Sequence, residues 1–272
     1  INPTRIGEEL DDITSQMQSS IFNCNQAKSR TRAASDIDAQ IPKENEVSFN
    51  NAVPSNAVDI TTGNPATWNP GIWKVPAGKT STPNRYIHGG NGTTIYVEGT
   101  LEKPNIYTDK ATIIVKKGGK LILGGNGNRI SGNGGTLIVE EGGTLETPSG
   151  ELQIANNEKI YIKGDLTTID YPHIQGTLYV NGNLTGKDFG SHIMNSNTRL
   201  YVSGKLTSTD ADLWTDGYIR VGGDIYAGSH AIYFQNTTHL IADCGIKANL
   251  VEVNSNNAEI HVNYIKCANF NQ

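Results

Sequence analysis

A short phrase recurs along the chain from Thr94 to Ile265: an alternating apolar strand, a glycine and a second aliphatic residue. Residues 177–184, with the sequence TLYVNGNL, are a clear example. The second inward aliphatic residue recurs at steps of 18 to 24 residues, at Val97, Val115, Val139, Ile162, Val180, Val202, Val221, Ala242 and Val262. A period of about 20 residues with strand-type alternation is typical of a solenoid, whose units stack because none can bury its apolar face alone.

The phrase predicts an all-β fold, a single-stranded right-handed parallel β-helix of about nine coils with about 20 residues each. Successive strand residues point to opposite faces, so Leu178 and Val180 are expected to face the core and Tyr179 the outside. Glycines such as Gly118 then form the corner, where positive φ favours glycine. The motif and helical return of a leucine-rich repeat are absent, and thirty glycines agree with a turn-rich β chain.

The N-terminal part of the chain lacks the phrase. Residues 1–27 carry apolar side chains at three- and four-residue spacing after Pro3, which predicts an amphipathic helix. We expect this helix to cap an open end of the solenoid, because an uncapped end exposes unpaired strand edges. Residues 28–66 are polar and are interpreted as an extended linker or a wrap, which leaves residues 67–272 for the β-helix.

Charge and hydropathy exclude several classes of protein. The net charge of −5 is scattered along the chain, so no basic stripe predicts a nucleic-acid partner. No apolar run approaches the roughly 18 residues of a membrane span, so no transmembrane segment is expected. The six histidines show no paired ligand spacing, and we predict neither a metal nor another cofactor.

Two further groups of residues are candidates for a local role. Cys244 and Cys267 are about one coil apart, so they predict a disulfide between neighbouring coils; two buried thiols are the alternative. Trp214 lies within the densest acidic stretch of the chain, residues 210–216. A solvated loop is the preferred interpretation of that stretch, and a Ca²⁺ or sugar contact with Trp214 as a stacking surface is the alternative.

The outward position of the repeated strand is apolar or aromatic on most coils, at Tyr96, Ile114, Ile138, Tyr161, Tyr179, Tyr201, Arg220, Ile241 and His261. Such a strip marks a contact surface. Three interpretations stay open: a self-stacking ladder, a face covered by the N-terminal helix or by residues 28–65, or an exposed platform for glycan or protein. Tyr161, Tyr179 and Tyr201 are the candidate ligand residues, because tyrosine offers sugars a flat apolar face and a hydroxyl.

The stretches 72–80 (IWKVPAGKT), 94–101 (TIYVEGTL) and 113–121 (IIVKKGGKL) resemble the β-helical part of secreted lipoproteins of the LruC-domain type from Bacteroidetes-like bacteria, over about residues 50–265. The resemblance implies an exported protein with a lipid anchor upstream of this chain and no established enzymatic chemistry. The acidic LruC domain itself is not part of the resemblance. Phrases such as residues 179–184 (YVNGNL) also resemble the polymerising β-helices of bactofilin type, which repeat at a shorter period.

We therefore expect a non-enzymatic, exported module for adhesion, glycan or protein binding, or display, located extracellularly or on the outer surface of a bacterium. One alternative is a polysaccharide lyase or glycoside hydrolase of the β-helix fold with degenerate motifs, and another is a polymerising scaffold. No catalytic residue is assigned, because neither paired acids nor a base beside carboxylate-neutralising groups emerges from the sequence.

Overall fold

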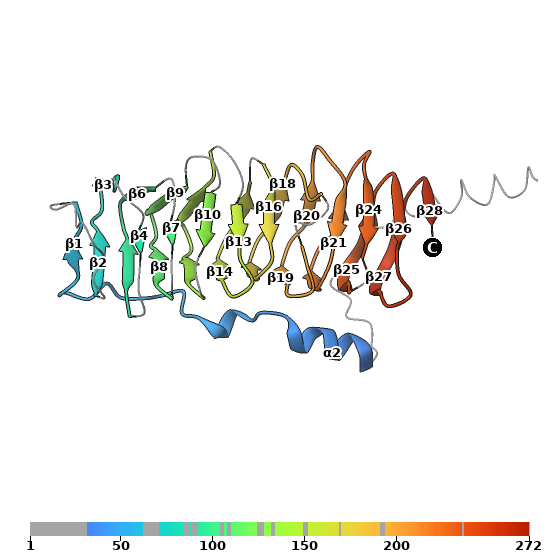
Figure 1. Cartoon of the computed structure of the whole chain (residues 1–272), viewed down its shortest axis with the longest axis horizontal. Coiled ribbons are helices and arrows are strands. Elements are labelled where there is room, and N and C mark those ends of the chain that lie inside the picture. The colour runs from blue at the N-terminus through green and yellow to red at the C-terminus, as the bar shows by residue number, and fades with distance from the viewer. Residues whose placement is uncertain are drawn as a thin grey trace, which may run out of the picture. The chain divides into compact units, whose positions relative to one another are not determined.

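The computed structural model describes residues 32–61, 71–83, 87–88, 92–103, 106–107, 110–123, 128–131, 134–148, 152–168, 170–190, 194–235 and 237–271. In this part the chain is nearly all β, and its parallel strands stack coil upon coil into a solenoid (Figure 1). The predicted helical cap, residues 1–27, lies outside the described residues.

The first face of the solenoid is a ladder of parallel strands: β2 (Ile72–Val75), β5 (Thr94–Val97), β8 (Thr112–Val115), β11 (Thr136–Val139), β14 (Lys159–Ile162), β17 (Thr177–Val180), β19 (Arg199–Val202), β22 (Tyr218–Val221), β25 (His239–Lys247) and β27 (Glu259–Lys266). Each aligned aliphatic residue, from Val97 to Val262, pairs with the next one in the series. The predicted register is therefore confirmed. Val75 pairs with Val97 and extends the ladder by one earlier coil.

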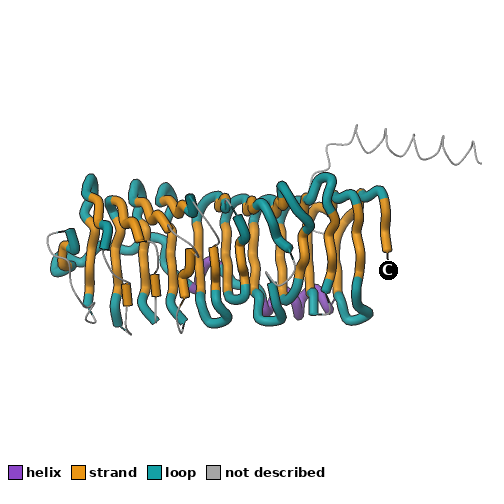
Figure 2. Tube along the Cα trace, turned by 45° about the horizontal axis from the view of Figure 1, so that its top comes forward, coloured by secondary structure: helices purple, strands orange, loops and turns teal. Residues whose placement is uncertain are grey.

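Shorter strands form the other two faces (Figure 2). The second face contains β3 (Thr80–Ser81), β6 (Thr100–Lys103), β9 (Lys120–Leu123) and β12 (Thr144–Glu146), then β15 (Leu166–Thr167), β18 (Leu184–Gly186), β20 (Leu206–Ser208) and β23 (Ile225–Tyr226). The third contains β4 (Ile87–His88), β7 (Ile106–Tyr107), β10 (Asn128–Ser131), β13 (Leu152–Ile154) and β16 (Pro172–Ile174), then β21 (Leu213–Thr215), β24 (Ala231–Phe234), β26 (Leu250–Val253) and β28 (Asn269–Asn271).

The core lies between the three faces and consists of inward aliphatic side chains. Val180, Leu184 and Leu213, one from each face, are fully buried. Burying such a side chain stabilises the fold by about 1.5–3 kcal/mol, and the stacked coils repeat this burial along the solenoid.

The corner glycines serve two different needs. Gly118 has a φ of 78°, a left-handed conformation that side chains other than glycine rarely adopt. At Gly99 the need is space, because a Cβ there would lie 2.2 Å from the carbonyl oxygen of Lys79 on the preceding coil. The expected role of positive φ therefore holds at some corners, and close backbone approach replaces it at others.

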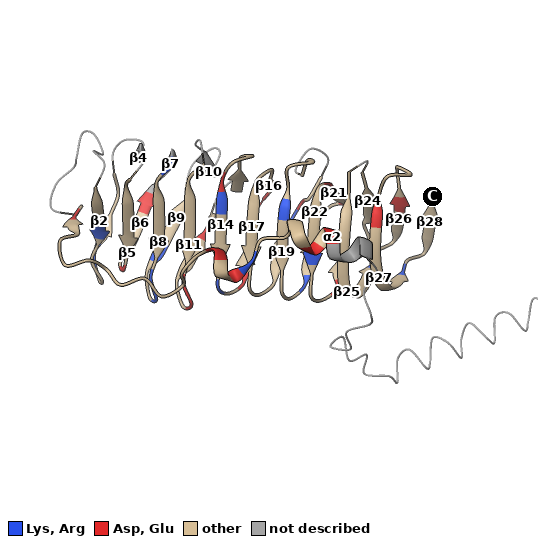
Figure 3. Ribbon diagram, turned by 90° about the horizontal axis from the view of Figure 1, so that it is seen from below, with Lys and Arg blue, Asp and Glu red and all other residues tan. Residues whose placement is uncertain are grey.

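The segment before the solenoid lies along its first face (Figure 3). It begins with helix α2 (Arg32–Gln40), which contacts β22 and β25, and it includes the short 3₁₀ helix η1 (Glu44–Glu46). It ends at β1 (Val58–Asp59), which pairs with β2. We call residues 41–57 the strap. A helix inside the predicted linker is explained by Ile37, which is buried against Ile241.

The predicted disulfide between Cys244 and Cys267 is wrong. Cys267 is a free thiol, whereas Cys244 is disulfide-bonded. The register explains the difference, since Lys247 pairs with Lys266 and Cys267 therefore lies beyond the position opposite Cys244. Cys24, the third cysteine of the sequence, lies outside the described residues.

Candidate functional site

The three candidate tyrosines lie in register on the outward side of the first face. Tyr161 on β14 pairs with Tyr179 on β17, which pairs with Tyr201 on β19. The rings of Tyr179 and Tyr201 are stacked, with centroids 4.7 Å apart and an interplanar angle of 13°. The rings of Tyr161 and Tyr179 are tilted by 31° at 5.9 Å. A self-stacking ladder is therefore present between Tyr179 and Tyr201.

The strap covers two of these tyrosines. The Tyr161 hydroxyl donates a hydrogen bond to Glu46 Oε2 over 2.6 Å, and the ring of Phe49 lies 6.2 Å from that of Tyr179. Only 1% of Tyr161 and 4% of Tyr179 remains exposed. The interpretation in which residues 28–65 cover the column fits these contacts. An exposed glycan platform does not hold for Tyr161 and Tyr179, because the strap occupies the space above them.

Burial also decides what these hydroxyls can do chemically. Burial, followed by the hydrogen bond to Glu46, raises the pKa of Tyr161 well above its usual value. Burial, followed by the charge of Glu44, does the same to the pKa of Tyr179. Both phenols stay protonated at physiological pH, so they act as hydrogen-bond donors and not as general bases.

A buried ion pair holds the strap further along the face. Glu140 is 5% exposed, and its Oε1 accepts a hydrogen bond from the backbone N–H of Asn51 at 2.8 Å. The Lys116 ammonium bonds both to the Asn51 carbonyl and to the second oxygen of Glu140. Lys116 and Glu140 lie on neighbouring coils and pair with each other, and Asn51 of the strap forms hydrogen bonds with both.

A pocket of about 350 Å³ remains between the strap and the column. Its walls are formed by Asp38, Ile41, Pro42, Lys43, Glu44, Tyr179, Tyr201 and Arg220. The Arg220 guanidinium is already paired, with Asp38 Oδ1 at 3.3 Å and with Asp243 Oδ2 at 2.6 Å. The volume is at the lower end of small-molecule sites, too small for an extended glycan.

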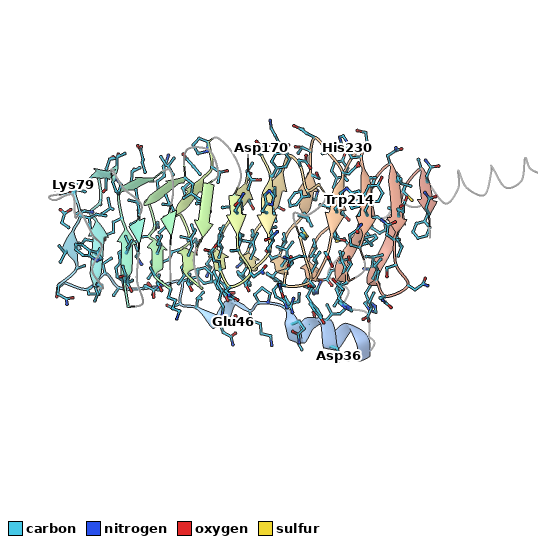
Figure 4. All side chains as sticks on the ribbon, viewed as in Figure 1. Asp36, Glu46, Lys79, Asp170, Trp214 and His230 are labelled. Atoms are coloured by element: carbon cyan, nitrogen blue, oxygen red, sulfur yellow. The ribbon has the colours of Figure 1, made fainter. Side chains whose placement is uncertain are left out.

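Trp214 lies on the third face and has an aromatic partner there. Trp214 on β21 pairs with Tyr233 on β24, and their rings stack with centroids 4.2 Å apart. Both side chains are half-buried, and the outward side of β21 carries Trp214 where Figure 4 labels it. We call this pair the Trp214–Tyr233 platform. One interpretation of the sequence is an exposed aromatic surface at the tyrosines of the first face, and the structure has a partly exposed one here on the third face.

The acidic stretch around Trp214 is divided among separate contacts. Asp210 lies 3.8 Å from the Lys187 ammonium, and Asp212 Oδ1 accepts the backbone N–H of Ala231 at 2.8 Å. Asp216 accepts the backbone N–H of Gly217 within its own turn. Among the residues that the structure describes, no group of three histidine, cysteine, aspartate or glutamate side chains could hold a metal ion.

Sequence reasoning missed Tyr233 and Glu252. In register, Tyr233 follows Trp214 and Glu252 follows Tyr233 on the next coil. The signal was present, because Ile232-Tyr233 repeats the inward–outward pair Leu213-Trp214 one coil later. The outward residues of the third face thus carry the same kind of sequence signal as those of the first.

No protein-family model, curated protein or solved structure matches this chain. The resemblance to LruC-domain-type lipoproteins and to bactofilins therefore stays a prediction. In the described part of the chain, no helix is both long enough and apolar enough to cross a bilayer. A function has to be argued from the chemistry of the sites themselves.

One polar cluster can be compared with a lyase site, which needs a deprotonated base. The Tyr264 hydroxyl donates to Asp224 Oδ1 at 2.6 Å, and the Lys247 ammonium lies 2.8 Å from Asp224 Oδ2. The hydrogen bond to Asp224 raises the pKa of Lys247, and burial followed by Asp224 raises that of Tyr264. Lys247 and Tyr264 both stay protonated near neutral pH, so neither of them is the deprotonated base that a lyase needs.

Proposed function

We propose that this protein is an exported, non-enzymatic surface module that binds glycans through the Trp214–Tyr233 platform. The observation that carries the proposal is the pair of stacked, half-buried rings on neighbouring coils of the third face. Each ring stacks one face on the other, so the outward ring edges and the polar atoms of the indole and the phenol remain available to a sugar. We also propose that the solenoid winds right-handed in about nine coils and that an N-terminal helix caps it.

The first face supports this assignment by contrast. Tyr161 and Tyr179 are covered by the strap, and the Tyr161 hydroxyl is bonded to Glu46. In the proposal, Tyr161, Tyr179 and Tyr201 fix the strap to the solenoid, and ligand binding is left to the third face.

Export is supported by the disulfide at Cys244, since disulfides persist mainly outside the reducing cytosol. An extracellular or outer-surface location, with a lipid anchor upstream of this chain, is the form of export that the lipoprotein resemblance implies. The protonated state of Lys247 and Tyr264 supports a non-enzymatic role over a lyase at that cluster. A glycoside hydrolase and a polymerising scaffold are the remaining alternatives.

The test is a glycan array probed with the wild-type protein and with Trp214→Ala, Trp214→Phe and Tyr226→Ala variants. Tyr226 is 45% exposed on β23 and serves as a matched control for the loss of a surface aromatic ring. We expect Trp214→Ala to weaken binding by about tenfold or more, which is about 1.4 kcal/mol, while Trp214→Phe retains most of it. Equal binding by Trp214→Ala and the wild type would remove the platform from the proposal.

A further inference from the structure

The outward residues around the platform are acidic. In register, the column on the third face continues from Trp214 to Tyr233 and then to Glu252. Asp212 immediately precedes β21 and lies two residues before Trp214. Its Oδ1 accepts the backbone N–H of Ala231, which is on the same coil as Tyr233. Asp212 therefore flanks the aromatic pair on the coil of Trp214, and Glu252 flanks it on the coil that follows Tyr233.

The negative charges of Asp212 and Glu252 act on the phenol group of Tyr233. Burial raises the pKa of Tyr233, and the negative charges of Asp212 and Glu252 raise it further. Both carboxylates therefore contribute a negative field at the phenol. A cationic group bound next to Tyr233 would be stabilised by this field, and an anionic group would be repelled.

The coil before Trp214 adds a third acid, Asp188. Phe189 pairs with Leu213 in a parallel bridge, so Gly190 precedes Trp214 in the outward column. A Cβ at Gly190 would lie 2.9 Å from Asp188 Oδ1, so the Asp188 carboxylate occupies the space beside this glycine. Asp188 folds back onto this glycine, and its Oδ1 accepts the backbone N–H of Gly190 at 2.7 Å.

We infer, resting on the proposed function, that the platform selects glycans built from amino sugars with a free, protonated amino group. The ring of the sugar would lie across the outward edges of Trp214 and Tyr233, and its ammonium group would lie against Asp212 and Glu252. Carboxylates also accept hydrogen bonds from sugar hydroxyls, so neutral sugars would bind more weakly and uronic acids least. Charge complementarity is what separates these three classes.

The experiment compares short oligomers of glucosamine, of N-acetylglucosamine and of galacturonic acid by calorimetry at low and high salt. The wild type should bind glucosamine oligomers about tenfold more tightly than the N-acetylated ones, as expected for two exposed ion pairs. This preference should shrink at high salt, because exposed charges are screened. Oligogalacturonate should bind most weakly.

Variants then separate stacking from charge. Asp212→Asn combined with Glu252→Gln should bind the amino and N-acetylated oligomers alike, because both changes remove charge and keep the size of the side chain. The amide oxygen that Asp212→Asn introduces can still accept the Ala231 N–H, so the local fold should be preserved. Glu146→Gln removes a carboxylate that pairs with Lys120 on the second face and should leave the preference unchanged. Circular dichroism melting checks that each variant folds.

Three results would overturn the inference. The first is equal wild-type affinity for the amino and N-acetylated oligomers, which would leave glycan binding itself standing. The second is tight binding of glucosamine oligomers by Trp214→Ala, which would assign the attraction to unspecific charge. The third is no binding of any oligosaccharide, and this result would overturn the proposed function together with the inference.

Discussion

Tyr161 and Glu46, 115 residues apart in sequence, are joined by a hydrogen bond of 2.6 Å between the phenol hydroxyl and a carboxylate oxygen. The bond links the strap to the middle of the first face, where Tyr161 is almost completely buried. It turns an apolar outward column, which would otherwise be a candidate docking surface, into the interior of the molecule.

Removing this bond should loosen the strap without disturbing the solenoid. Tyr161→Phe keeps the ring and deletes the hydroxyl, so we expect a loss of about 1 kcal/mol in the free energy of unfolding. Denaturant unfolding measures this loss, and limited proteolysis should show faster cleavage within residues 41–57. Glu46→Gln is the matched variant. Additive losses in the double variant would contradict a direct bond, since two interacting partners should not contribute independently.

The Lys116–Glu140 pair should be more sensitive to the loss of one partner than of both. Lys116→Met leaves the Glu140 carboxylate buried beneath the strap without its cation, which we expect to cost about 3 kcal/mol. Adding Glu140→Leu should restore part of that loss because it removes the uncompensated charge. Thermal unfolding of both variants measures the difference. A double variant less stable than Lys116→Met would contradict this account.

Asp224 should make the stability depend on acid pH. Burial by itself raises the pKa of this carboxyl, but hydrogen bonds from Lys247 and Tyr264 outweigh it and hold the pKa below its usual value. A depressed folded pKa means that the stabilisation is complete above the unfolded pKa, about 3.9, and is lost as the pH falls through the folded pKa.

The melting temperature of wild type and Asp224→Asn, measured from neutral pH down to strong acid, checks this sign. The wild type should exceed the variant by a constant margin above about pH 4, and the margin should shrink at lower pH. Tyr264→Phe, which removes one of the two side-chain donors, should show a smaller change of the same sign. A margin that grows on acidification would contradict the prediction.

The two described cysteines should differ under alkylation. In the unfolded, unreduced protein Cys267 should react with iodoacetamide and Cys244 should react only after reduction. Peptide mapping by mass spectrometry measures both. Cys244→Ser should destabilise the fold by about 2–4 kcal/mol, whereas Cys267→Ser should have little effect. Alkylation of Cys244 without reductant would contradict the disulfide.

Much of the scaffold was predictable because its information is local. The alternation around Val180 and the glycine that follows it recur on each coil. The sequence of each coil is therefore enough to predict which of its side chains face inward. The pairing of Val180 with Val202 and with Ile162 then follows from stacking identical units. Helix α2 was not predicted, because its buried side is completed by Ile241, a residue far along the chain.

The candidate site was predicted only in part. Trp214 was chosen for its acidic surroundings, yet its stacking partner Tyr233 lies on the next coil and was overlooked. Cys244 and Cys267 have a spacing close to one coil, but Ala242 pairs with Val262 and Gly245 with Tyr264, so the coil is shorter here and Cys267 lies beyond the position opposite Cys244. Spacing along a solenoid thus predicts proximity only where it equals the length of the local coil.

The sequence by itself determined the solenoid, its register and the row of outward aromatic residues, because the period and the apolar–polar alternation recur in every coil. The tertiary structure alone decided that the strap covers Tyr161 and Tyr179 and that Trp214 stacks on Tyr233 at an acidic surface. The physical reason is that a strand pattern fixes which side of a sheet a residue occupies, whereas covering that side depends on contacts between segments far apart in the chain.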